Sequence, residues 1–274
     1  PRSFMVFTGS NLGRDRSSEI TGSISYQSIP DNLIEIAVHF EGGSDGVLDN
    51  EDRLIFYGRG SNGIDHNGLD MSHHQNLYFT ENTYWLLIPD DNTLQGKRVT
   101  SIEPVTNTGV TMDYGISPFY VESDLINPFA GGLAWAGAAI MNGSSHTAVT
   151  TMDSPNPLVD VHVTMGFLGN SSSIDAQANP VHLLEIYHGS RDALQTTNSW
   201  AGLIKSDVFF SFSGNRLNDG VNIFIIDNES TSSYSQPHFD YLVGDYGRNL
   251  DDQGLPYEFF APIHSNATTF RIIA

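Results

Sequence analysis

The stretch Leu33-Ile34-Glu35-Ile36-Ala37-Val38-His39-Phe40 alternates in part between apolar and polar side chains. Such a period of two is typical of a β-strand that buries one of its faces. Similar segments recur along the chain, separated by clusters of Gly, Asn, Asp, Ser and Pro, the residues that form turns. We expect strands at 4–7, 20–29, 33–40, 54–57, 83–88 and 98–103, and then at 158–167, 182–187, 207–212, 222–226, 241–246, 257–260 and 268–273.

The number and spacing of these short strands predict an all-β fold of antiparallel β-sandwiches, of the jelly-roll or Greek-key kind. Only Asp192–Leu203 is a candidate for a short helix or a wide loop. The chain has 274 residues, enough for two such domains. Small residues around Gly131 favour a junction near 123–127, which predicts an N-terminal sandwich at 1–124 and a C-terminal jelly-roll-like sandwich at 125–274. A single large sandwich with long loops is the alternative.

Charge and composition argue against several classes of function. The chain has 12 Lys and Arg residues against 32 Asp and Glu residues, and a net charge of −20 repels a nucleic-acid backbone. Cysteine is absent, so the chain has neither disulfides nor a thiolate nucleophile. No apolar run approaches the ~20 residues of a membrane-spanning helix, and we expect no membrane span.

The acidic segment 41–52 has the rhythm of a twelve-residue calcium loop. Glu41, Asp45, Asp49 and Asp52 place side-chain oxygens at positions one, five, nine and twelve, and the carbonyl of Val47 stands at position seven. We therefore predict Ca²⁺ as a cofactor bound by these five residues. Position three is a glycine and position twelve is not the bidentate glutamate, and no flanking helices are evident. A solvated acidic turn, with aspartates capping backbone amides, is the alternative.

A polar segment at 64–76 contains His66, His73 and His74 together with Asp65 and Asp70. Imidazole and carboxylate groups are the ligands that catalytic zinc or iron would use. The usual helical spacing of two histidine ligands is missing, however, so we expect a mobile solvated loop.

Aromatic side chains offer another kind of site, because planar rings can stack on sugars. The candidates are Tyr26, Trp85, Trp135, Tyr187, Trp200 and Tyr234. Trp200 lies in a polar stretch and is the best candidate for a solvent-facing ring, although packing in the core is the commoner role. A calcium-dependent carbohydrate-binding module is thus an alternative function. The chain has no nucleophile elbow and no phosphate-binding glycine loop, and its carboxylates stand in no recognisable catalytic setting, so we expect no enzyme.

Three spaced motifs give a more specific indication. The first is Ser44–Gly58, which ends in Phe56-Tyr57-Gly58; the second is Asn127–Gly137, preceded by Glu122; the third is Asp240-Tyr241 followed by Tyr246-Gly247-Arg248-Asn249-Leu250. Their order and spacing resemble the all-β region that precedes the catalytic domain in gingipain-type cysteine peptidases and in the related sortase of the type IX secretion system. The second motif departs from that pattern, because Leu133 and Ala138 replace an arginine and a glutamate.

The resemblance implies a non-catalytic region of a secreted or cell-surface bacterial protein. Such a region would support, shield or present a neighbouring peptidase-like domain or another cell-surface protein. Because the peptidase-like domain normally follows this region, we expect an excised N-terminal region or a truncated homologue. The resemblance also implies a structural role for Arg248, which would pair with a carboxylate or cap carbonyl groups.

Overall fold

A computed structural model describes residues 4–9, 33–42, 49–60, 63–67, 70–74, 81–88, 95–100, 110–128, 130, 134–171, 181–251, 259–262 and 267–272. The contacts between Cα atoms divide the chain into two compact units. The first comprises Pro1–Gly63 and His74–Val105, and the second comprises Ile64–His73 and Thr106–Ala274.

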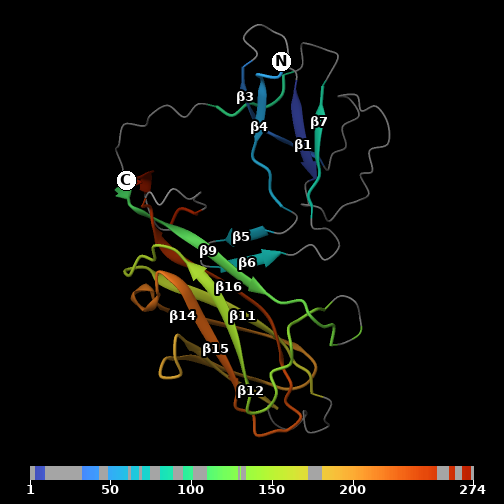
Figure 1. The fold of residues 1–274 in the computed structure, drawn as a ribbon, viewed down its shortest axis with the longest axis vertical. Coiled ribbons are helices and arrows are strands. Elements are labelled where there is room, and N and C mark those ends of the chain that lie inside the picture. Colours follow the sequence, from blue (N-terminus) through green and yellow to red (C-terminus); the bar gives the residue numbers. More distant parts are fainter. Residues whose placement is uncertain are drawn as a thin grey trace. The chain divides into compact units, whose positions relative to one another are not determined.

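The N-terminal unit contains a three-stranded antiparallel sheet and a separate hairpin. β1 (Met5–Gly9) lies between β2 (Leu33–Ile36) and β7 (Tyr84–Leu87). β3 (Val38–Glu41) and β4 (Arg53–Phe56) pair as an antiparallel hairpin (Figure 1). The successive residues Phe4, Met5, Val6 and Phe7 are all buried, so β1 is covered on both faces and forms the core of this unit.

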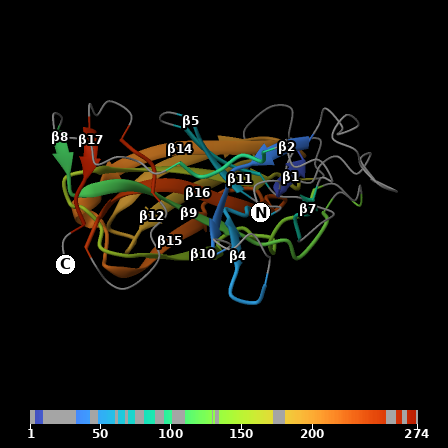
Figure 2. The ribbon, with the colours of Figure 1, turned by 90° about the horizontal axis from the view of Figure 1, so that it is seen from above.

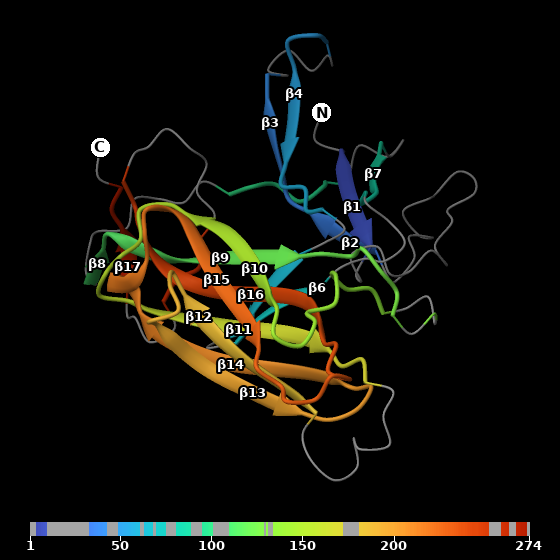
Figure 3. The ribbon, with the colours of Figure 1, turned by 60° about the horizontal axis from the view of Figure 1, so that its bottom comes forward.

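The C-terminal unit is a sandwich of two four-stranded antiparallel sheets. The first sheet has the order β10 (Ser145–Met152), β15 (Gly220–Asn228), β12 (His182–His188) and β13 (Leu194–Trp200). The second has the order β14 (Lys205–Ser213), β11 (Asp160–Leu168), β16 (His238–Asn249) and β9 (Tyr114–Glu122). The two sheets lie over one another (Figure 1, Figure 2 and Figure 3). The predicted all-β fold with antiparallel sandwich packing is confirmed.

Alternating side chains of the two sheets fill the space between them. In β12, the residues His182, Leu184, Ile186 and His188 are buried and the residues between them are half-buried. Strand β11 shows the same alternation over its first half, and β16 is buried on almost every residue. Eighteen buried residues from both sheets and the neighbouring segments form one hydrophobic cluster, and removing this apolar surface from water is the main stabilising contribution.

Two segments that were expected to lack strands contain them. Asp192–Leu203, expected as a short helix or a wide loop, contains strand β13, because its Thr, Asn and Ser residues pair with β12 at the edge of the sheet. The segment 64–76, expected as a solvated loop, contains the paired strands β5 (Gly63–Asn67) and β6 (Asp70–His74). The ring of His73 stacks on Tyr120 of β9, a tertiary contact that local sequence does not reveal.

Shorter elements complete the second unit. β8 (Val110–Met112) and β17 (Ala267–Phe270) pair in parallel, and the 3-10 helix η3 (Gly214–Arg216) follows β14. The strand expected at 20–29 lies outside the described residues.

The division between Val105 and Thr106 falls before the boundary predicted at residue 124. Strand β9 precedes that predicted boundary, yet it pairs along its whole length with β16 of the C-terminal unit. The segment that follows β9 also pairs within the C-terminal unit, because Ile126 forms a β-bridge with Ala136. Independent folding of two halves, with the bounds 1–124 and 125–274, stays a prediction.

Candidate functional site

The predicted calcium loop connects β3 to β4. The structure describes Glu41, Asp49 and Asp52, whereas Asp45 and Val47 lie outside the described residues. The Asp52 carboxylate accepts a hydrogen bond from the Asp49 amide at 3.0 Å, and the Asp49 carboxylate accepts one from the Glu51 amide at 2.8 Å. Both interactions are those of an acidic turn, and they leave further oxygen lone pairs for a cation. The calcium-binding role of the five residues therefore stays a prediction.

A second group of carboxylates lies in the C-terminal unit. In the part of the chain that the structure describes, Glu122, Asp124 and Asp240 form the one group of three potential ligands whose oxygens lie within 4.8 Å of one another. Glu122 ends β9, and Asp240 lies in β16 beside Tyr241, the residue that pairs with Glu122. Asp240 is the extra residue of a β-bulge, at the point where the pairing between β11 and β16 shifts by one residue. A bulge of this kind changes the direction in which a side chain leaves its strand.

The environment of this acidic cluster is partly neutralised. The Lys205 ammonium lies 2.8 Å from Asp240, and the Tyr120 hydroxyl donates a hydrogen bond to Glu122. Burial raises the pKa of Glu122, and the charges of Asp124 and Asp240 raise it further. Burial also raises the pKa of Asp240, although Lys205 acts in the opposite direction. Three such oxygens suit a hard cation such as Ca²⁺, which would compete with Lys205 for Asp240.

Sequence reasoning did not find this cluster. Glu122 and Asp240 were each named as members of separate motifs, but Asp124 was not named at all. The three come together only because β9 pairs with β16, a contact between segments more than a hundred residues apart. No local signal encodes that proximity.

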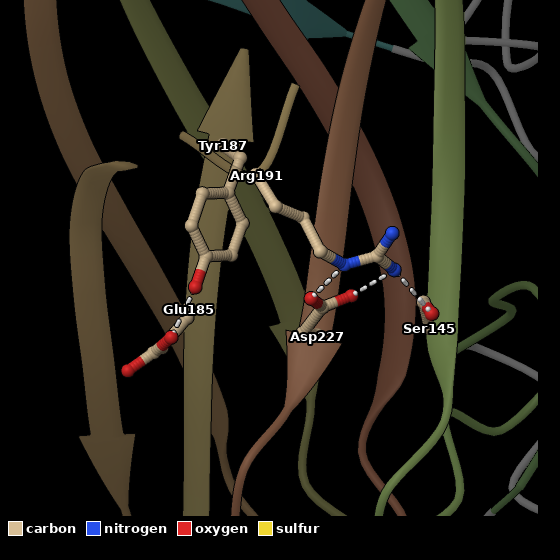
Figure 4. A network of polar contacts seen from close by, with 5 residues as sticks. All are labelled: Ser145, Glu185, Tyr187, Arg191 and Asp227. Carbon is tan, nitrogen blue, oxygen red and sulfur yellow. Dashed lines mark hydrogen bonds and ion pairs between the residues drawn. The ribbon is translucent and has the colours of Figure 1, made fainter. Parts of the chain in front are cut away.

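A polar network lies on the outer face of the sheet β10-β15-β12-β13 (Figure 4). Arg191, from the loop between β12 and β13, reaches across β15. Its guanidinium donates two hydrogen bonds to Asp227, at 2.6 and 2.9 Å, and one to Ser145 of β10 at 3.0 Å. Beside it, the Tyr187 hydroxyl donates a hydrogen bond to Glu185, two residues earlier in β12. The contacts of Arg191 therefore link β15 to β10, and the Tyr187–Glu185 pair of β12 forms a separate contact on the same face.

The other sequence candidates have different places in the structure. The side chains of His66 and His74 lie outside the described residues, and His73 stacks on Tyr120. Trp200 is only 8% exposed and packs against Phe167 and His182, so its role is the commoner one of core packing and it is not a solvent-facing platform. Trp135 and Tyr234 are exposed, Tyr187 and Trp85 are half-buried, and Tyr26 is outside the described residues.

One further pair combines a base with a buried acid. His162 of β11 lies opposite Asp245 of β16, with 2.8 Å between the imidazole Nδ1 and a carboxylate oxygen. This hydrogen bond raises the pKa of His162 above its usual value, against the opposing effect of burial. The pair cross-links two central strands, which is a structural role.

The fold resembles part of a protein of known structure. A crystal structure of dimeric latent PorU from Porphyromonas gingivalis matches 97% of this chain with a TM-score of 0.64 at 12% sequence identity. This match confirms, at the level of the fold, the resemblance to gingipain-type and type IX secretion proteins that the three motifs indicated. The chain spans only about a quarter of PorU, since the match covers 24% of that protein.

Other likenesses are weaker. The CBM36-1 domain of a multidomain xylanase from the hindgut metagenome of Trinervitermes trinervoides matches 47% of this chain and 96% of its own, with a TM-score of 0.31 and 11% identity. A CBM36 module in complex with calcium and xylotriose matches 46% of this chain and 97% of its own, with a TM-score of 0.28 and 10% identity. At these scores, nothing about ligands follows for this chain. No protein-family model and no curated protein matches the sequence. In the described part of the chain, no helix has the length and hydropathy that crossing a membrane requires.

Proposed function

We propose that this chain is a non-catalytic structural and interaction region of a secreted or cell-surface protein. In this role it supports or presents a neighbouring peptidase-like domain or another cell-surface protein. The observation that carries the proposal is the likeness to PorU, which extends over almost the whole of this chain but over only 24% of PorU. The absence of cysteine from the sequence agrees with it, since a gingipain-type peptidase needs a thiolate nucleophile.

The chemistry of the third motif also favours a supporting role. Its ionisable side chains are buried and pair with more exposed partners, Asp240 with Lys205 at 2.8 Å and Arg248 with Asp153 at 3.5 Å. Groups held in this way stabilise a scaffold, and they are poorly placed to react with a substrate.

The decisive experiment deletes part of this chain from the gene in the host organism. We expect deletion of residues 106–274 to lower the amount or the activity of the attached or associated partner in the extracellular fraction. A point variant of an exposed residue, such as Tyr234→Ser, serves as the control and should leave both unchanged. Normal extracellular amount and activity after the deletion would refute the supporting role.

A separate assay tests the absence of catalysis and the alternative function. The purified chain should cleave no member of a broad peptide library, and cleavage that survives repurification would contradict the proposal. A calcium-dependent carbohydrate-binding module, the alternative, would bind glycans on an array and lose that binding in a chelator. Such a result would replace the supporting role with sugar recognition.

A further inference from the structure

The outer face of the sheet β10-β15-β12-β13 is exposed and unusually apolar at its centre. Val149, Leu194, Val221 and Ile223 are respectively 50%, 49%, 56% and 36% exposed. Val149 pairs directly with Ile223 across the strands, so these side chains are neighbours on one face. We name this surface, together with Tyr187 and Glu185, the β15 face. Contiguous exposed apolar groups with a polar rim are typical of surfaces that contact another molecule.

Tyr187 occupies a defined position on this face. In the strand pairing it lies between Ile225 of β15 and Leu194 of β13, so aliphatic groups flank the ring on both sides. Figure 4 shows the ring lying along its strand, with the hydroxyl directed to Glu185. This hydrogen bond restrains the ring and leaves its π-face available to a partner.

The electrostatics around the ring are negative. The hydrogen bond to Glu185 raises the pKa of Tyr187 to about 12, and burial and the charges of Glu185, Asp227 and Glu229 add to the effect. The guanidinium of Arg191 donates two hydrogen bonds to Asp227. A cation placed between a carboxylate and an aromatic ring is attracted by the charge of the carboxylate and by the quadrupole of the ring.

We propose that the β15 face binds a basic segment of a partner protein. An Arg or Lys side chain of the segment lies over Tyr187 with its head group at Glu185, and neighbouring aliphatic side chains pack on Ile223 and Val149. The long stems of Arg and Lys match the aliphatic flanks, while their charge matches the carboxylates. A second copy of this chain is a poor occupant, because its own charge of −20 repels it. The inference rests on the proposed interaction role and names the kind of partner.

The test uses the full chain, labelled with ¹⁵N, and the synthetic peptide acetyl-Ser-Arg-Ser-Val-Ser-Ile-amide, which places Arg, Val and Ile on one face of an extended strand. We expect millimolar peptide to shift the amide resonances of Tyr187, Ile223 and Ile225. Replacing Arg by citrulline, which has nearly the same shape but no charge, should weaken binding about three- to fivefold. Raising the salt from about 50 to about 500 mM should weaken it as well.

Two variants of the chain locate the contact. Tyr187→Leu removes the ring and Glu185→Gln removes the charge, and each should weaken binding about two- to fivefold. Tyr234→Leu is the matched control, since this exposed tyrosine follows β15 and belongs to neither the network nor the β15 face, and the variant should bind as the unaltered chain does. Melting temperatures close to that of the unaltered chain show that the variants remain folded.

Several results would overturn the inference. They are the absence of any shift at millimolar peptide, equal binding of the arginine and citrulline peptides, and unchanged binding by Tyr187→Leu. Shifts at the same residues on adding xylo- or gluco-oligosaccharides, at lower concentration than the peptide requires, would assign the face to sugars. Shifts that depend on protein concentration alone would assign it to self-association. A negative result here, with a positive deletion experiment, would refute this contact and leave the supporting role intact.

Discussion

Truncation of Phe224 tests the register of the sandwich most directly. Its ring is completely buried and lies among those of His188, Phe119 and Phe212, with centroids 5.1, 6.4 and 6.3 Å away. Phe→Ala in a core costs about 3–5 kcal/mol, and each well-placed ring pair adds about 0.5–1.5 kcal/mol to simple burial. We therefore expect Phe224→Ala to lower the free energy of unfolding by about 4–5 kcal/mol.

The matched control is Phe209→Ala. Phe209 is the same residue type in the same unit, but it is 57% exposed on the outer side of β14, so its truncation should cost less than about 1 kcal/mol. Urea unfolding, followed by tryptophan fluorescence and far-ultraviolet circular dichroism, measures both variants against the unaltered chain. A loss below about 2 kcal/mol for Phe224→Ala, or equal losses for the two variants, would refute the described packing.

Three further predictions concern pH, domain bounds and calcium. Burial lowers the pKa of His188, so the stability that neutral His188 contributes is present above about pH 6.5 and is lost as the pH falls. The hydrogen bond to Asp245 raises the pKa of His162, so the stability that protonated His162 contributes is complete below about pH 6.5 and is lost as the pH rises. In urea titrations at about pH 7.5 and 5.5, His188→Gln should therefore reduce the loss of stability on acidification and His162→Gln should increase it, and the opposite order would contradict both assignments. The fragment 106–274 should unfold cooperatively, whereas 125–274, which lacks β9, should not; a cooperative 125–274 would instead support the boundary predicted from sequence. If the acidic loop binds calcium, free Ca²⁺ at a hundred times its dissociation constant should stabilise the chain by about 2.7 kcal/mol, and Asp45→Ala should remove that gain. A melting temperature that neither calcium nor a chelator changes would show that the loop is a plain acidic turn.

The fold class was predictable because hydrophobic alternation is a local property. Strand β12 illustrates this, since a strand was predicted at 182–187 and His182–His188 form one, with alternating burial. Strands β10 and β13 were not predicted. Their outward faces carry Ser and Thr residues, and the partner strands provide the pairing that local composition does not encode.

The candidate sites were less predictable for a related reason. The sequence offered the acidic loop at 41–52 as a calcium site, because its spacing is visible in one short segment. The group Glu122, Asp124 and Asp240, and the contact between Arg191 and Asp227, both depend on the pairing of strands that are distant in the chain. The sequence indicated Tyr187 only as one aromatic residue among several. Its hydrogen bond to Glu185, on the outer face of β12, is visible only in the structure.

The residues of the third motif hold the sandwich together. Most of the third motif lies in β16, whose residues are buried almost throughout. Tyr246 exchanges hydrogen bonds with the backbone of Asp153, at 3.1 and 3.2 Å, and the Arg248 side chain lies 3.5 Å from the carboxylate of the same residue. Substituting either one should disturb packing before it disturbs any encounter with a partner, because a buried polar group that loses its partner destabilises the folded state. We therefore expect recognition at positions outside the third motif. The outward-facing Tyr187 and Glu185 are of this kind, since they form a hydrogen bond with each other on a surface that other molecules can reach.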